Sequence, residues 1–258
     1  MAFDPICAGS LCVRLAANDE EITASQKLRY QIFCEEMGGA ASDEIRAQKR
    51  DFDDYDAVCD HLLVVDEDQS ENMGIVGTYR LLRSGPMQKI GRFYTEHEYD
   101  ISALKAYEGE LLELGRSCVD VRYRNRSVMT LLWRGIGAYV SSYGIKLMFG
   151  CASFTGADPQ KHALALSYLH HFHLAPPEVR LKTLPEYYVS MNMIPKDQID
   201  QRAALREIPP LIKGYLRLNG VIGDGAFVDT IYNTTDVSII VETDQVTDLY
   251  SKRYGPDS

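Results

Sequence analysis

The sequence predicts an α/β (α+β) fold, with a mixed, mostly antiparallel sheet and helices on both faces. Its segments follow one another as strand, helix, two or three strands, helix, strand, helix, which is not the strict alternation of parallel βαβ units. Two of these strands, 61–66 and 74–82, are separated only by a polar turn and form a hairpin. Hydrophobic residues make up 45% of the 258 residues, so the chain can bury the core of one large domain.

The first elements are a strand and a long helix. Residues 11–15 alternate in polarity as a strand does, and Asn18 followed by Glu21 resembles a capping box. A helix is therefore expected over about 19–37, ended by a pair of glycines. The hairpin follows an acidic loop, and residues 84–108 show no regular pattern.

The second half of the chain contains the remaining elements. We expect one domain over 1–258, with a core at about 11–175 and a C-terminal part at about 176–258. The glycine-rich segment 223–225 is typical of a turn. The expected elements are a strand around Glu113, a helix at 128–143, a buried strand at 146–154, helices at about 161–171 and 211–218, and strands at 227–232 and 237–242.

Composition and charge exclude several classes of protein. The net charge of −10 argues against nucleic acid as the main partner, since a phosphate backbone is bound by a clustered basic surface. The N-terminus lacks the pattern of a signal peptide, and no window approaches the roughly 20 apolar residues that span a bilayer. Six cysteines are scattered without a Cys-x-x-Cys pair, so we expect reduced thiols and a cytoplasmic location.

A basic turn stands between an apolar strand and the helix that follows it. Arg122, Arg124 and Arg126 lie where free backbone N–H groups and the helix dipole favour an anion. The spacing is that of the acyl-CoA loop of GNAT acyltransferases, but Asn125 and Ser127 replace its two small residues. Because these side chains limit the approach of a bulky pyrophosphate, a donor with one phosphate fits better, such as 4'-phosphopantetheine on acyl carrier protein. The alternative is a solvated turn.

Charged residues also lie inside an apolar segment. Glu113 and Arg116 occupy an apolar run, where a charge is costly unless it is paired or functional. The alternative is that they face solvent or pair with Arg80 on the neighbouring strand.

Acidic residues gather just before the strand at 61–66. Such a cluster can bind a cationic substrate, coordinate a hard metal ion or form a solvated loop. Four histidines lie within 162–173, but no cysteine or carboxylate completes a zinc spacing, so no metal site is expected. The acidic residues are Asp51, Asp53, Asp54, Asp56 and Asp60.

Several motifs occur in order along almost the whole chain. They are Arg29-x-x-x-Phe33, the Asp53 and Asp56 pair, Cys59-Asp60-His61-Leu62, Gly77-Thr78-Tyr79-Arg80, Glu113-Leu114-Gly115-Arg116, Phe149 to Phe154 and Asn233 to Val237. Together they resemble the bacterial L-ornithine Nα-acyltransferases, which make lyso-ornithine lipid from 3-hydroxyacyl-acyl carrier protein. The chain is more distantly similar to acyl-homoserine lactone synthases. Both families have the GNAT fold, which implies a splayed sheet.

The resemblance implies an active-site cleft that receives the pantetheine arm between two separating strands. Glu113 would take a proton from the attacking amine, and a backbone N–H near Cys118 or Val119 would polarise the thioester carbonyl. Tyr168 would protonate the leaving thiolate, unless it is a core residue. The ornithine side-chain ammonium would be held by Asp53, Asp54, Asp56 and Asp60, and its carboxylate by Arg29 or Arg80. The expected substrate-binding residues are Arg29, Phe33, Asp53, Asp54, Asp56, Asp60, Arg80, Arg116, Ser153 and Phe154.

The expected product joins a long acyl chain to a charged head group. We therefore expect peripheral attachment to the inner membrane through the amphipathic segment 211–218, which carries Lys213 and Arg217. Three alternatives stay open: the same chemistry on glutamine, glycine or lysine; a homoserine lactone synthase, which would need S-adenosylmethionine; and an inactive lipid-binding or haemolysin-like protein.

Overall fold

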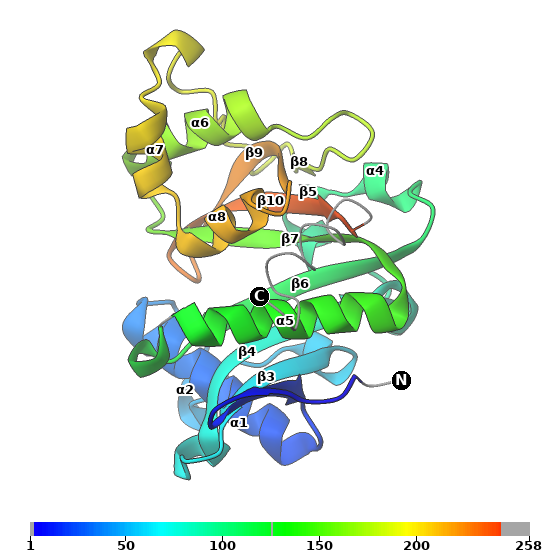
Figure 1. The fold of residues 1–258 in the computed structure, drawn as a ribbon. Helices are drawn as coiled ribbons and strands as arrows, with labels where there is room; N and C mark the ends of the chain where they lie inside the picture. The colour runs from blue at the N-terminus through cyan, green and yellow to red at the C-terminus, as the bar shows by residue number, and fades with distance from the viewer. Residues whose placement is uncertain (1–2, 125, 244–258) are drawn as a thin grey trace.

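The computed structural model describes residues 3–124 and 126–243. Within them, ten strands form one sheet in the order β1-β2-β3-β4-β6-β7-β10-β9-β8-β5 (Figure 1). The strands are β1 (Ile6–Ala8), β2 (Leu11–Leu15), β3 (Asp60–Asp66), β4 (Ile75–Arg83), β5 (Tyr99–Asp100), β6 (Glu110–Val119), β7 (Ile145–Thr155), β8 (Lys182–Thr183), β9 (Val221–Asp229) and β10 (Thr234–Glu242). The α-helices are α1 (Asp19–Tyr30), α2 (Asp43–Gln48), α3 (Ser84–Met87), α4 (Ser102–Lys105), α5 (Arg126–Tyr143), α6 (Ala163–His173), α7 (Gln201–Glu207) and α8 (Pro210–Leu216).

The sheet is mixed and mostly antiparallel, as the order of elements predicts. Among the named strands that the structure describes, only β6 with β7 and β8 with β9 pair in parallel. Strands β9 and β10 extend the sheet beside β7, so strands from the C-terminal part complete it.

Helices cover both faces of the sheet, and the side chains of β3 show why. Leu62 and Val64 belong to the hydrophobic core that includes α5, whereas Leu63 and Val65 pack with Leu28 of α1. Successive side chains of a strand point to opposite faces of the sheet, so β3 packs against α5 on one face and against α1 on the other. Figure 1 shows α5 in front of the sheet and α1 behind it.

The N-terminal part departs from the prediction in two places. The predicted helix is α-helical as far as Tyr30 and continues as a π-helix over Gln31–Glu36. Cys7 and Cys12 form a disulfide between β1 and β2, so the expectation of reduced thiols is wrong for this pair. The two cysteines face each other in the hairpin register, a proximity that their sequence spacing alone does not reveal.

The expected turn at 223–225 is also wrong, because this segment lies within β9. A Cβ atom on Gly223 would lie 2.7 Å from the carbonyl oxygen of Leu181. Glycine here permits close approach of the neighbouring chain and does not mark a reversal of direction.

Strands β6 and β7 separate halfway along their length. Their parallel pairing runs from Glu110 opposite Ile145 to Glu113 opposite Phe149 and goes no further among the described residues. Gly150 lies just beyond the last pair, where a Cβ atom would be 2.2 Å from the carbonyl oxygen of Leu114. The backbones of β6 and β7 therefore approach each other closely at this point before the two strands separate.

A bulge in β6 adds to the separation. Thr78 pairs with Cys118 and Arg80 with Gly115, so two residues of β6 stand opposite the single residue Tyr79 of β4. Arg116, one of these two residues, has a left-handed φ of 50°. A bulge redirects a side chain, and here it turns Arg116 into the space beside β7.

Candidate active site

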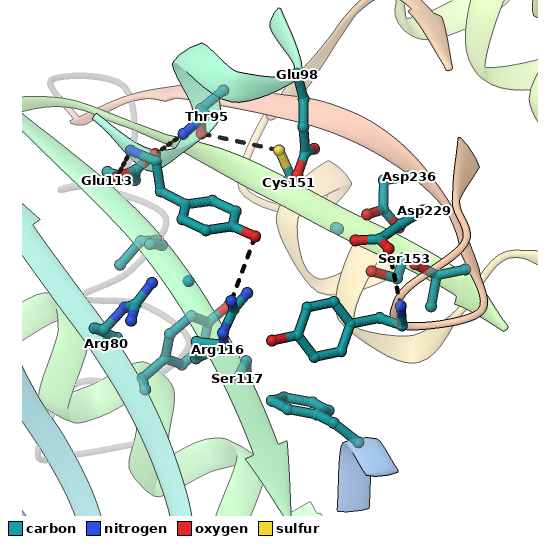
Figure 2. A pocket seen from close by; sticks show the side chains of 18 of the residues that line it. Arg80, Thr95, Glu98, Glu113, Arg116, Ser117, Cys151, Ser153, Asp229 and Asp236 are labelled. Atoms are coloured by element: carbon teal, nitrogen blue, oxygen red, sulfur yellow. Dashed lines mark hydrogen bonds between the residues drawn. The ribbon is translucent and has the colours of Figure 1, made fainter. Parts of the chain in front are cut away.

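A cavity of about 220 Å³ lies where β6 and β7 separate (Figure 2). Its walls come mainly from β4, β6, β7, β10 and the segment before β5. Of the residues that the resemblance implies, five line it: Phe33, Arg80, Glu113, Arg116 and Ser153. The cavity occupies the predicted gap in the sheet, and the predicted base and two cationic side chains share it.

Arg29 lies behind the cavity wall and is 1% exposed. Its guanidinium donates to Asp51 Oδ2 at 2.8 Å and to the two carboxylate oxygens of Asp56 at 2.8 and 2.9 Å. Burial acts to raise the pKa of Asp56, but the hydrogen bonds and charge of Arg29 and the charge of Arg80 lower it below 3.8. Arg29 is fully engaged with these aspartates, so it positions the wall and does not reach the substrate.

Arg80 and Arg116 join the same network from the cavity side. Arg80 donates to Asp53 Oδ1 at 2.5 Å. The guanidinium of Arg116 lies between the rings of Tyr94 and Tyr232, 4.7 Å from each centroid, and 3.4 Å from Asp53 Oδ2. The aspartates are therefore counter-ions of arginines, and the expectation that Asp53 and Asp56 hold a substrate ammonium is not supported by their contacts.

The other two aspartates of the acidic loop lie away from the cavity. Asp54 is exposed in a short 3₁₀ helix at Asp54–Ala57. Asp60 accepts a hydrogen bond from the Tyr139 hydroxyl at 2.5 Å and lies 3.5 Å from the Arg83 guanidinium. Neither contributes to the cavity wall among the residues described.

Glu113 is buried at the edge of the cavity, and both its carboxylate oxygens are engaged. Oε1 accepts the Thr95 N–H at 2.6 Å and Oε2 accepts the Tyr94 N–H at 2.9 Å. Burial raises the pKa of Glu113 above the ordinary 4.5, although these hydrogen bonds act in the opposite direction. Glu113 thus holds the segment that places Tyr94 over Arg116, in addition to lining the cavity.

Four of the expected site residues lie in the hydrophobic core and not at the cavity. Tyr168 on α6 stacks on Phe172 and its hydroxyl is 3.3 Å from His173 Nε2. Its position gives the predicted general-acid role no support, because α6 packs against α7 and β9. The other three are Phe154, Cys118 and Val119, and the β6 backbone that lines the cavity ends at Ser117.

In the basic turn before α5, Arg122 and Arg124 are exposed and already have acidic partners. Arg122 binds Asp120 at 2.7 Å and Glu71 at 3.1 Å, and Arg124 binds Glu36 at 2.7 Å. Ser127 is exposed in the first turn of α5. Arg126 begins that helix, and Asn125 lies outside the described residues. A donor phosphate would have to compete with these carboxylates.

Sequence reasoning missed a second acidic group that lines the cavity, formed by Glu98, Asp229 and Asp236. Asp236 belongs to the motif at Asn233 to Val237, which was a signal for its importance but not for its partners. The roles of Tyr94 and Tyr232 around Arg116 were also missed, because no local pattern brings these distant segments together.

Fold and cavity together define a class of protein, the GNAT acyltransferases. A family model described as an acetyltransferase (GNAT) domain matches residues 28–134. A solved structure of a CoA-dependent acyl-homoserine lactone synthase, BjaI, aligns with a TM-score of 0.51 at 13% identity over 93% of this chain and 84% of that one. At that identity the similarity shows the fold alone.

Curated relatives narrow the class to a family. An L-ornithine N(alpha)-acyltransferase of Agrobacterium fabrum is 46% identical over 97% of this chain and 87% of its own length. The enzyme of the same name from Brucella abortus is 45% identical over 97% of this chain and 90% of its own length. The chain belongs to the L-ornithine N(alpha)-acyltransferase family, and it is an acyltransferase.

Proposed function

We propose that this enzyme transfers a 3-hydroxyacyl group from acyl carrier protein to the α-amine of L-ornithine. The product is lyso-ornithine lipid, and the reaction is the first step of ornithine lipid biosynthesis. The observation that carries the proposal is the cavity between the separating strands β6 and β7, which exposes the backbone of Leu114 to Ser117 to a ligand. The names of the relatives supply the acceptor, L-ornithine.

The donor would enter from the N-terminus of α5. Its phosphopantetheine phosphate would lie beside Arg122, Arg124 and Ser127, and its arm would extend between β6 and β7 toward the bulge. Backbone N–H groups near the bulge would polarise the thioester carbonyl as negative charge develops on its oxygen.

Arg80 and Arg116 face the cavity, and we assign the ornithine carboxylate to them. Glu113 would accept the proton of the α-amine, directly or through a water. Burial favours this role, because a base with a raised pKa takes up a proton more readily.

Acyl transfer would be direct. The amine nitrogen attacks the thioester carbon, the C–N bond forms, the C–S bond breaks, and the leaving thiolate takes up a proton. A cysteine-bound intermediate is disfavoured, because burial raises the pKa of Cys59 to about 12 and that of Cys151 well above 9.0. Both thiols line the cavity but stay protonated at neutral pH, and the thiolate is the nucleophilic form.

Peripheral attachment to the inner membrane also stays a proposal. None of the helices in the described segments combines the length and apolar character needed to cross a bilayer. The segment expected to attach, α8, does not offer an apolar face to lipid, because Ile212 and Tyr215 are buried against the core and Tyr215 packs on Trp133. Flotation with anionic liposomes tests attachment by any other surface.

Release of free thiol from 3-hydroxyacyl-acyl carrier protein tests the function. We expect release that depends on L-ornithine, together with a product whose mass equals ornithine plus the 3-hydroxy fatty acid less one water. Parallel reactions with glutamine, glycine and lysine test the related aminolipid activities. Turnover with acyl-CoA and none with the carrier protein would overturn the assignment of the donor.

A further inference from the structure

Three carboxylates at one end of the cavity have no role in the chemistry described so far. Glu98 precedes β5, Asp229 ends β9 and Asp236 lies in β10. One oxygen of each lies within 4.8 Å of the others. All three line the cavity and none is more than 8% exposed. Figure 2 shows them grouped on the side opposite Arg80. We call them the acidic cluster.

The acidic cluster contains polar atoms without partners. Glu98 Oε2 and Asp236 Oδ1 accept no hydrogen bond from the described residues, and the hydroxyl of Thr234, a 2% exposed residue of the cavity wall, is also unpaired. No lysine or arginine of the described segments forms a salt bridge with the cluster. Buried polar atoms nearly always have partners, so a ligand is the expected partner here.

Electrostatics indicate that this ligand is a cation. Burial raises the pKa of Glu98 and of Asp236, and the neighbouring carboxylates raise both further. Without a ligand, protonation relieves the repulsion between these carboxyl groups, and a bound positive charge would relieve it in place of those protons.

We propose that the acidic cluster binds the side-chain ammonium of the acceptor and so selects basic amino acids. This rests on the proposed function, since it concerns the acceptor of that reaction. An ammonium offers three N–H donors, one for each carboxylate. The acceptor would then lie across the cavity, with its carboxylate at Arg80 and Arg116 and its side chain reaching Glu98, Asp229 and Asp236.

The α-amine of the acceptor is not suited to binding at the acidic cluster. Three carboxylates would stabilise its charged form and raise its pKa, whereas the nucleophile must be the free base. The side-chain ammonium stays charged throughout the reaction, so the same carboxylates assist binding without suppressing the attack.

Kinetics with ornithine and norvaline test the assignment, since norvaline has the same carbon chain without the terminal amine. We expect the wild-type enzyme to prefer ornithine by at least about 100-fold in kcat/KM. Asp236→Asn and Glu98→Gln should each lower kcat/KM for ornithine by roughly 10- to 100-fold and leave norvaline turnover unchanged. Asp43→Asn removes a carboxylate that is 99% exposed on α2 and should change neither value.

The outcomes separate failure of this assignment from failure of the proposed function. Equal use of ornithine and norvaline by the wild type, or equal losses for both in the variants, would overturn the ammonium site and leave acyl transfer intact. An absence of ornithine-dependent thiol release by the wild type would overturn the function itself. The thermal midpoint reports independently whether each variant is folded. Activity that is abolished by EDTA and restored by Mn²⁺ would identify the cluster as a metal site and also refute the assignment.

Discussion

Arg29 and Asp56 form a bidentate ion pair in the interior, with N–O distances of 2.8 and 2.9 Å. Asp56 Oδ1 also accepts from Arg80 at 3.2 Å, so the pair connects α1 to an arginine that lines the cavity. The segment before β3 is thereby fixed between a helix on one face of the sheet and the strand that carries Arg80.

Removal of one partner of this pair should strongly destabilise the fold. We expect Arg29→Met to lower the free energy of unfolding by about 3–5 kcal/mol, because Asp51 and Asp56 each lose the buried arginine that makes their shortest ion pair. Urea denaturation followed by circular dichroism measures the change. The matched control is Arg46→Met, which breaks an exposed pair with Asp43 and should cost at most about 1 kcal/mol. Equal losses in the two variants would contradict the role of Arg29.

The same pair predicts how stability depends on pH. The pKa of Asp56 is lowered in the folded protein by its arginines, and the ordinary value of 3.8 applies when the chain unfolds. Its contribution is therefore complete above pH 3.8 and is lost as pH falls further, since the unfolded chain then binds more protons. Urea midpoints measured across this range should fall more steeply in the wild type than in Asp56→Asn. Parallel curves would show that Asp56 contributes nothing to acid stability.

Local patterns predicted the central strands of the sheet and helix α5, because the periodicity of each element depends only on its own residues, but they missed β1, β5 and β8 and placed β9 too late in the chain. The hairpin β3–β4, strand β6, helix α5 and strand β7 lie close to their expected ranges. Their order and the polarity of their residues were sufficient to predict a mixed sheet with helices on both faces.

The site was predictable only in part, because charge pairing is a long-range property. The motifs in the sequence placed Arg29, Asp53 and Arg80 near one another. They could not show that Asp53 and Asp56 form ion pairs with the arginines of the site and are therefore not free to bind a substrate. Glu98 was missed because it lies within the segment 84–108, which shows no regular pattern and is held in place by hydrogen bonds from the backbone N–H groups of Tyr94 and Thr95 to Glu113.

Glu113→Gln tests whether this residue is a base or a support. As a base, Glu113 must be ionised, so kcat/KM should rise with pH through a pKa above 4.5 and then level off. We expect Glu113→Gln to lower kcat by about 100-fold or more and to remove this acidic limb. An acidic limb that persists in the variant would instead assign Glu113 to the support of Tyr94 and Thr95.

Arg80→Lys tests the assignment of the acceptor carboxylate. A lysine keeps the charge but cannot make the planar two-pronged contact of a guanidinium, so we expect KM for ornithine to rise by about 10-fold. Turnover of 1,4-diaminobutane, which lacks the carboxylate, should not change. Arg83→Lys on the same strand is the control, since Arg83 pairs with Asp60 away from the cavity. A similar rise in KM for both amines would place the carboxylate elsewhere.

The basic turn before α5 offers a test in which one substitution should tighten binding of the acyl donor. Arg124 is held by Glu36, so Glu36→Gln releases its charge toward an incoming phosphate and should lower KM for acyl-acyl carrier protein by several-fold. Arg124→Gln should raise that KM by a similar factor, and both effects should shrink as salt is added. KM for ornithine should stay constant in both variants, because neither residue lines the acceptor cavity. A donor KM that is insensitive to both changes would remove Arg124 from the donor site.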